Sequence, residues 1–206
     1  MITKATFSLS RRRYGFHSSW AVWSSLDAKS GPKYNMADLS MFEEINLQKT
    51  LKKLHTRYVL VALNMSTKDI VLKLSNFHGS NGNVNKAAFA FYGTPLWGSY
   101  MTDVIKDYKE PDSKKVVKFL KSEEGKKFEK ESCKNFGREL ARLGADRATL
   151  IALGNDTDSI LRQHFPEGKK KIIKIPHYGA WMSKEKYKSE VHRVLRKNSI
   201  NIRSKT

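Results

Sequence analysis

One short, unbroken apolar run limits the fold more than any other feature of the chain. Residues 58–63 read Tyr-Val-Leu-Val-Ala-Leu, and the run ends abruptly at Asn64. A strand that is apolar at every position is buried on both faces, which is typical of a central strand in a parallel sheet. Residues 149–153 form a second such run, and residues 100–105 and 171–175 are further candidate strands. The sequence therefore predicts a sheet of four strands.

Segments with helical spacing separate these strands. We expect helices in five places, residues 39–55, 86–92, 113–142, 156–165 and 183–197. Residues 27–38 and 75–85 are rich in glycine and polar residues, which predicts loops. Strands that alternate with helices indicate an α/β fold, in which a central, mostly parallel sheet lies between two layers of helices. The expected architecture is a three-layer α/β/α fold around a four-stranded sheet.

The chain has 206 residues and no internal repeat, which suits a single domain over residues 1–206. Residues 1–38 are expected to form an aromatic and basic extension that packs on this domain. Phe16, Trp20, Val22 and Trp23 alternate as in a half-buried strand. The run Arg11–Arg13, with several serines and no acidic residue before residue 27, also has the composition of a mitochondrial transit peptide. We favour structured chain here.

The remaining composition limits the compartment and the partners. The single cysteine, Cys133, cannot form an intrachain disulfide or hold an iron–sulfur cluster, which fits a reducing, cytoplasmic location. No apolar run approaches the roughly 20 residues of a membrane span, and the N-terminus lacks the apolar core of a signal peptide. We therefore expect no membrane association through a spanning segment.

The chain is strongly basic, with 39 Lys and Arg against 20 Asp and Glu, a formal net charge of +19. Such an excess favours a polyanionic partner, most often nucleic acid, with anionic membranes and ribosomes as alternatives. Most basic residues form only a solvated face. Lys169, Lys170 and Lys171 lead into the strand before His177, which makes them the preferred candidates for phosphate contacts.

Polar side chains gather where the predicted strands end. Asn64 follows the first strand, Asp103 lies in the second, Asn155 and Asp156 follow the third, and His177 follows the fourth. Ligand sites of parallel sheets lie at the carboxyl ends of the strands. Each residue also has an ordinary interpretation: Asn64 as a turn residue, Asp103 in an ion pair, Asp156 as a helix N-cap and His177 as a surface histidine.

Four segments, taken in order, resemble the uracil-DNA glycosylase superfamily. They are Leu63-Asn64-Met65-Ser66, Ser99 to Lys106, Leu150-Ile151-Ala152-Leu153-Gly154 and Ile175-Pro176-His177-Tyr178-Gly179. The resemblance implies a DNA glycosylase that flips a base out of the helix and hydrolyses its N-glycosidic bond, leaving an abasic site. It further implies a monomer that needs neither a cofactor nor a metal, and it covers about residues 58–195.

The same resemblance assigns roles to individual residues. Asn64 would orient the attacking water, and His177 would donate to the base oxygen O2 as negative charge develops there. Phe77 is the candidate for stacking on the flipped base, with core packing as the alternative, and His78 beside it would assist or merely be solvated. Tyr178 or Trp181 would wedge into the duplex where the base has left, or else pack in the core.

Two departures from the superfamily pattern bear on the base. Met65 and Ser66 stand where the main uracil enzymes have a proline and a tyrosine that blocks C5, so the C5 side is expected to be open. Asp103 replaces the base-reading asparagine. A neutral aspartate could donate to N3 of cytosine and accept from N4, which favours a cytosine-type base. Because excising normal cytosine would destroy the genome, we expect a 5-substituted cytosine, as in phage DNA, and a role in anti-phage defence.

Three alternatives remain open from the sequence. The chain could be a repair glycosylase for uracil or another deaminated base that tolerates Asp103. It could be a non-catalytic DNA-binding protein on the same fold, since fold does not imply activity. It could also be an RNA- or ribosome-associated basic protein that is unrelated to glycosylases. The ordered set of motifs makes the last alternative the weakest.

Overall fold

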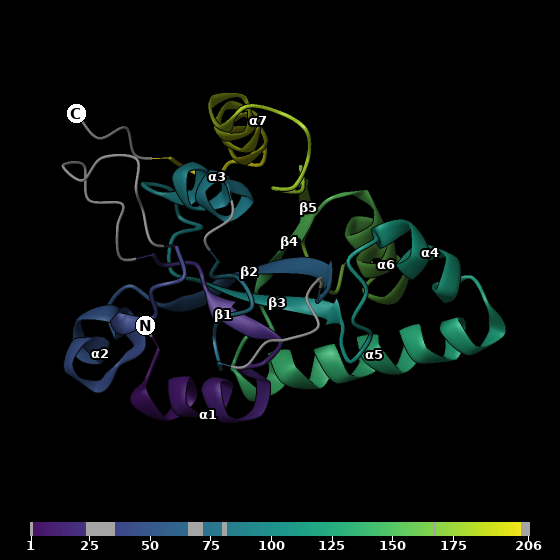
Figure 1. Ribbon diagram of the computed structural model, residues 1–206, viewed down its shortest axis with the longest axis horizontal. Coiled ribbons are helices and arrows are strands. Elements are labelled where there is room, and N and C mark those ends of the chain that lie inside the picture. The colour runs from purple at the N-terminus through teal and green to yellow at the C-terminus, as the bar shows by residue number, and fades with distance from the viewer. Residues whose placement is uncertain (1, 24–35, 66–71, 80–81, 167, 203–206) are drawn as a thin grey trace.

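A five-stranded mixed sheet forms the centre of the computed structural model, which describes residues 2–23, 36–65, 72–79, 82–166 and 168–202 (Figure 1). In chain order its strands are β1 (Ser18–Trp20), β2 (His55–Asn64), β3 (Ser99–Ile105), β4 (Thr149–Leu153) and β5 (Ile172–Ile175). In space the order is β1-β3-β2-β4-β5. The four strands from β3 to β5 run parallel, and β1 pairs antiparallel with β3. The expectation of four strands was therefore wrong by one antiparallel edge strand.

Helices cover both faces of this sheet, as expected for an α/β fold. They are α1 (Lys4–Tyr14), α2 (Glu44–Leu51), α3 (Gly82–Phe91), α4 (Ser113–Leu120), α5 (Glu123–Arg142), α6 (Asn155–His164) and α7 (Lys184–Lys197), with a 3-10 turn η1 (Ser40–Phe42). Val59 and Val61 of β2 pack with residues of α1, α4, α5 and α6, whereas Leu60 and Ala62 pack with residues of α3 and α7. Figure 1 shows α3 and α7 on one side of the sheet and α1 and α5 on the other.

The N-terminal segment contributes a helix and a strand to the same core. Helix α1 was not predicted; it is capped by Thr3, whose side chain accepts from the Thr6 amide, and it buries Phe7. All three residues of β1 are buried, so the half-buried alternation expected here was wrong. Trp20 is completely buried, and its ring lies edge-on to that of Tyr100 at 5.0 Å. Most of the loop expected at 27–38 lies outside the described residues.

The predicted helix over residues 113–142 is broken into two helices. Helix α5 starts after Ser122, whose hydroxyl accepts from the Gly125 amide at 3.0 Å. A Cβ on Gly125 would lie 1.9 Å from the carbonyl oxygen of Phe119. Only glycine permits this close approach between the end of α4 and the first turn of α5. In the described part of the chain, no helix is long and apolar enough to cross a membrane.

Candidate functional site

A cavity of about 860 Å³ opens at the carboxyl ends of the parallel strands. Its wall comes from the ends of β2 and β4, from the segment after β5, and from the first turns of α3, α4 and α6. The polar residues that line it are Asn64, Ser75, Asn76, His78, Asn83, Ser113, Asn155, Asp156, Thr157, His177 and Tyr178. The structure thus brings Asn64, His78, His177 and Tyr178 together, four of the residues that the sequence singled out.

Asn64 is held rigidly at the end of β2. The two hydrogens of its amide nitrogen are shared among three backbone carbonyl oxygens, those of Met65 at 3.1 Å, Tyr108 at 3.1 Å and Glu110 at 2.9 Å. Three acceptors around one atom fix which end of the amide is the NH₂ group. The carbonyl oxygen of Asn64 is therefore the atom left to hold a water or a ligand in the cavity.

His177 follows β5 and is fixed by its own loop. Its Nδ1 accepts a hydrogen bond from the Gly179 amide at 3.0 Å, and its ring stacks on that of Tyr178 with centroids 4.4 Å apart. Burial lowers the pKa of His177 below the ordinary value, and the positive charge of Lys86 lowers it further. A neutral ring whose Nδ1 accepts carries its proton on Nε2. His177 is thus a neutral donor beside the cavity.

The backbone around the cavity favours negative charge. Helices α3, α4 and α6 all direct their amino ends to it, and a helix amino end carries a partial positive charge. Helix α6 begins after Gly154, which has φ = 96° and so adopts a conformation that favours glycine. A Cβ on Gly154 would lie 3.3 Å from the Cβ of His177. Asp156 lies in the first turn of α6 rather than at its N-cap, contrary to expectation.

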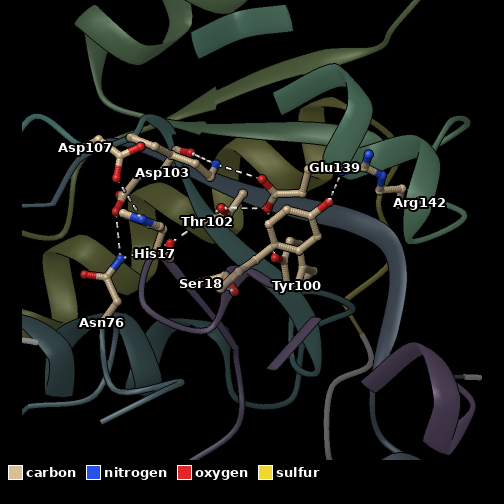
Figure 2. A network of polar contacts seen from close by, with 11 residues as sticks. His17, Ser18, Asn76, Tyr100, Thr102, Asp103, Asp107, Glu139 and Arg142 are labelled. Atoms are coloured by element: carbon tan, nitrogen blue, oxygen red, sulfur yellow. Dashed lines mark hydrogen bonds and ion pairs between the residues drawn. The ribbon is translucent and has the colours of Figure 1, made fainter. Parts of the chain in front are cut away.

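Asp103 does not line the cavity. It is 1% exposed, and its carboxylate oxygen Oδ2 accepts from the amide nitrogen of Asn76 at 2.7 Å (Figure 2). Burial raises the pKa of Asp103 to about 7, although the hydrogen bond from Asn76 opposes this rise. Asn76 is part of the cavity wall, so Asn76 stands where the sequence placed Asp103.

The three remaining base-contact candidates have different outcomes. Phe77 is 3% exposed and packs in the core on the α3 and α7 side, which agrees with its ordinary interpretation rather than with base stacking. His78 borders the cavity, yet its ring packs against Trp23 and Phe42 and is buried rather than solvated. Burial lowers the pKa of His78 to about 4, so its ring is neutral. Ser66 lies outside the described residues.

Tyr178 and Trp181, the two candidates for wedging into the duplex, differ in their exposure. Tyr178 is largely buried under His177, and burial raises the pKa of its hydroxyl well above the ordinary value. Trp181 is fully exposed, at 104% of the reference accessibility. It directly follows Ala180, which lines the cavity. A fully exposed tryptophan beside a cavity is unusual for a side chain that normally seeks burial.

The lysine run 169–171 lies at the wrong end of the sheet for a phosphate contact at the cavity. These residues precede β5, whereas the cavity follows it. The Leu150 amide, at the start of β4, donates to the Lys171 carbonyl. The Lys170 ammonium donates to the backbone carbonyl oxygens of Ala145 and Asp146. Strand β5 therefore separates this run from the cavity, and its assignment as a phosphate contact stays a prediction.

A different set of lysines lies on α3 and α7, the helices on either side of the loop that follows His177. Lys86 of α3 donates to the Ala180 carbonyl at 2.9 Å, which fixes the loop that carries Trp181. Lys184 and Lys188 of α7 lie over the ring of Phe89, with Nζ 4.5 and 4.4 Å from its centroid. These cation–π contacts hold both ammonium groups at the same ring of α3. We call Lys86, Lys184 and Lys188 the α3–α7 lysines.

Sequence reasoning missed Asn76, Asn83 and Lys86. All three lie in or just after the stretch 75–85, which was expected to be only a loop. Its four asparagines within eleven residues, Asn76, Asn81, Asn83 and Asn85, were the available signal for a polar binding wall. Helix α3 begins inside this stretch, at Gly82, and so directs its first turn to the cavity.

No group of three or more His, Cys, Asp or Glu side chains that could hold a metal ion occurs within the described ranges. The cavity wall is instead rich in amides and hydroxyls, which bind through hydrogen bonds. Neither a scan against protein-family models nor a search of curated proteins gives a match, so the function of this site has to be inferred from its geometry.

Proposed function

We propose that the protein is a monofunctional DNA glycosylase that flips a base into this cavity and hydrolyses its N-glycosidic bond. The observation that carries the proposal is the pairing of two fixed groups in one cavity. Asn64 offers a locked carbonyl oxygen, and His177 offers a neutral Nε2–H donor. Loss of a base leaves positive charge on the sugar and negative charge on the base. The Asn64 oxygen can position a water to attack the sugar, and the His177 donor can stabilise the charge on the base.

Asn64 would hold the water that attacks the anomeric carbon. Because its amide nitrogen is occupied by three carbonyls, its oxygen is the atom that would accept a hydrogen bond from that water. A pre-oriented acceptor costs no reorganisation during the reaction. An amide is a weak base, so the role of Asn64 is to position the water rather than to remove its proton.

His177 would stabilise the departing base. A neutral imidazole can donate from Nε2 to a base oxygen that becomes negative, and it keeps its proton throughout. The amino ends of α3, α4 and α6 favour the same negative charge. The lowered pKa of His177 supports a donor of this kind rather than a general acid.

The proposed substrate is a 5-substituted cytosine, with anti-phage defence as the biological role and uracil repair as the alternative. A cavity of about 860 Å³ is in the range that accommodates drug-sized ligands, so it has room for a base with a substituent. The buried position of Asp103 removes the direct contact on which the preference for cytosine first rested. The size of the cavity supports the substituent at C5, and the excision assay has to distinguish cytosine from uracil.

The fold and the surface also support a DNA enzyme. The parallel order β3-β2-β4-β5, with helices on both faces, is compatible with the three-layer fold that the resemblance implies. DNA would lie across the mouth of the cavity, with Trp181 filling the gap left by the flipped base and the α3–α7 lysines facing phosphates. We propose a cytoplasmic monomer that works without a cofactor.

An excision assay tests the proposal directly. Duplex and single-stranded oligonucleotides would carry uracil, hypoxanthine, cytosine, 5-hydroxymethylcytosine or its glucosylated form, and alkali would convert abasic sites into strand breaks. We expect cleavage at one modified base, a loss of 10²–10³-fold in the His177→Ala variant and a comparable loss in Asn64→Ala. DNA binding, measured by fluorescence anisotropy, should survive in both variants.

The outcomes separate the competing functions. Excision of uracil alone would support the repair enzyme and reject the cytosine-type substrate. Tight, salt-sensitive DNA binding without any abasic site would reject the enzyme and support a non-catalytic DNA-binding protein. Weak DNA binding together with tight RNA binding would reject the DNA partner itself.

A further inference from the structure

We propose that Asn76 is the residue that reads the base, that it does so as a hydrogen-bond acceptor, and that Asp103 positions it. This inference rests on the proposed function, because it concerns a base bound in the same cavity. It differs from the resemblance, which places Asp103 itself at the edge of the base. The ligand that it selects is a base with an N–H donor facing the loop between β2 and α3.

The carboxylate of Asp103 and a backbone carbonyl clamp the Asn76 amide from one side. Its Nδ2 donates to Asp103 Oδ2 at 2.7 Å and to the carbonyl oxygen of His17 at 3.1 Å. Both partners accept, so both hydrogens of the NH₂ group are used and the amide cannot rotate without breaking two bonds. In Figure 2 the oxygen of Asn76 points away from both partners. Since Asn76 lines the cavity, that oxygen is what it offers to a ligand.

The two groups that hold the Asn76 amide, the Asp103 carboxylate and the His17 carbonyl, are themselves held by buried contacts. The Asp103 amide donates to the same His17 carbonyl at 3.3 Å, so this carbonyl serves both residues. The Lys106 ammonium donates to the Asp103 carbonyl and forms an ion pair with the buried Glu139 carboxylate at 2.8 Å. The network shown in Figure 2 thus links α5 to the cavity wall through β3. Such a connected network restricts the orientation of its members.

An acceptor at this point selects the ligand by its chemistry. Uracil presents N3–H and cytosine presents its N4 amino group, and either can donate to the Asn76 oxygen. A base that lacks a donor there would leave that oxygen desolvated and unpaired, which costs about ten-fold or more in affinity. The shared requirement is an N–H donor, and the experiment below distinguishes its two sources.

The test is a binding cycle that does not depend on catalysis. Oligonucleotides would carry 2′-fluoroarabino nucleotides, which resist hydrolysis, in two pairs: uracil with N3-methyluracil, and 5-hydroxymethylcytosine with its N4,N4-dimethyl derivative. Each methylation removes the N–H donor from the base. Affinities would be measured by fluorescence anisotropy for the wild-type protein and for the variants Asn76→Ala, Asp103→Ala, Asp103→Asn and Asn83→Ala.

We expect methylation of one pair to weaken wild-type binding about ten-fold or more, and to have no effect in Asn76→Ala. Asp103→Ala should lose most of this discrimination between methylated and unmethylated bases. Asp103→Asn, which keeps an oxygen that can accept from the Asn76 amide, should retain it. A purely structural role of Asp103 would change the affinity for both members of a pair equally. Asn83→Ala, which removes the unclamped amide of the same wall, should retain the discrimination.

Equal binding of both members of both pairs by the wild-type protein would overturn the inference. So would a loss of discrimination in Asn83→Ala but not in Asn76→Ala. Discrimination in binding without any excision in the assay above would support the base-reading role of Asn76 and reject the glycosylase activity. Excision that is lost in Asn64→Ala but is insensitive to methylation of the base would support the glycosylase activity and reject the base-reading role of Asn76.

Discussion

His177 illustrates how a single loop can fix the chemistry of a side chain. The Gly179 amide lies two residues along the chain and donates to Nδ1, so the proton of the neutral ring must lie on Nε2. The carbonyl of Pro176, on the other side of His177, accepts from the buried Tyr187 hydroxyl at 3.1 Å. The loop is therefore anchored on both sides of His177, and the ring orientation does not depend on a bound ligand.

We predict that His177 remains neutral, with the proton on Nε2, throughout the pH range of activity. Burial and the charge of Lys86 both lower its pKa, so the imidazolium form should appear only below the range expected for a free histidine. ¹⁵N NMR of histidine-labelled protein, with His177→Gln used to assign the signal, would measure both properties. In the urea-unfolded protein the same ring should titrate near 6.5. A folded-state titration at or above that value would contradict the prediction.

Burial of the ionised Asp103 carboxylate should lower the free energy of unfolding, and this effect can be measured. Its pKa is about 7 in the folded protein against 3.8 for an unburied aspartate. Because the folded pKa is raised, folding is most favourable when the carboxyl is protonated, and stability falls as the pH rises from about 4 to 7. The difference of roughly three units corresponds to a cost on the order of 4 kcal/mol above pH 7.

The variant Asp103→Asn should therefore be more stable than the wild type at pH 8, by up to that amount, and about equally stable at pH 4. Urea unfolding at a series of pH values would measure the difference, in which the titrations of all other groups cancel. The asparagine keeps an oxygen for the Asn76 amide, so the clamp should survive. A stability difference that does not change with pH would show that Asp103 has an ordinary pKa.

At the scale of elements, α5 is tied to β3 by one buried carboxylate. Glu139 is 1% exposed, and its Oε1 accepts from the Tyr100 hydroxyl at 2.8 Å and from the Thr102 hydroxyl at 2.9 Å. Its Oε2 forms the ion pair with Lys106 (Figure 2). Two partners on β3 and a third directly after it make Glu139 the main polar link between this helix and the sheet.

Removing that carboxylate should cost more than any other polar truncation on α5. We predict that Glu139→Ala lowers the free energy of unfolding by about 3–5 kcal/mol, because it leaves the Lys106 ammonium buried without its partner. Glu131→Ala, on the exposed side of the same helix, should cost about 0–1 kcal/mol. Chemical unfolding monitored by circular dichroism would compare the two. Similar losses in both variants would contradict the assigned role of Glu139.

The elements that could be predicted from the sequence are those with a strong pattern of burial. Residues 149–153 were predicted with their observed bounds, because a strand buried on both faces is apolar at nearly every position. Helix α1 has no such pattern, since it buries only Phe7 and Ser10 and its stability depends on the Thr3 cap and on contacts made by the fold. Strand β1 contains two serines, and only its pairing with β3 makes it a strand.

Only the site residues that lie at the ends of strands could be predicted from the sequence. Asn64 ends one parallel strand and His177 follows another, and the ends of such strands meet whatever the loops do. The lysine run 169–171 is near His177 in sequence, but β5 separates it from the cavity. Asn76 was overlooked because its importance comes from Asp103, 27 residues further along the chain. Contacts of that kind leave no local pattern.

At the scale of the whole molecule, the net charge of +19 does not by itself indicate where a polyanion binds. Two groups of lysines differ in position: the run 169–171 precedes β5, and the α3–α7 lysines lie on the helices α3 and α7. Of these two groups, the second is connected to the cavity through the bond from Lys86 to the Ala180 carbonyl. Under the proposed function, we therefore expect DNA that delivers a base to the cavity to contact this second group and Trp181.

The double variant Lys184→Glu/Lys188→Glu should therefore weaken DNA binding much more than Lys169→Glu/Lys171→Glu, although both change the net charge by the same amount. Removing a phosphate contact lowers the slope of log affinity against log salt by about one per contact. We expect a slope reduced by up to about two in the first variant and nearly unchanged in the second. Anisotropy titrations over a range of salt concentrations would measure both slopes. Equal losses would mean that the charge acts as a diffuse field, and a greater loss in the second variant would place the DNA at the amino end of the sheet, away from the cavity.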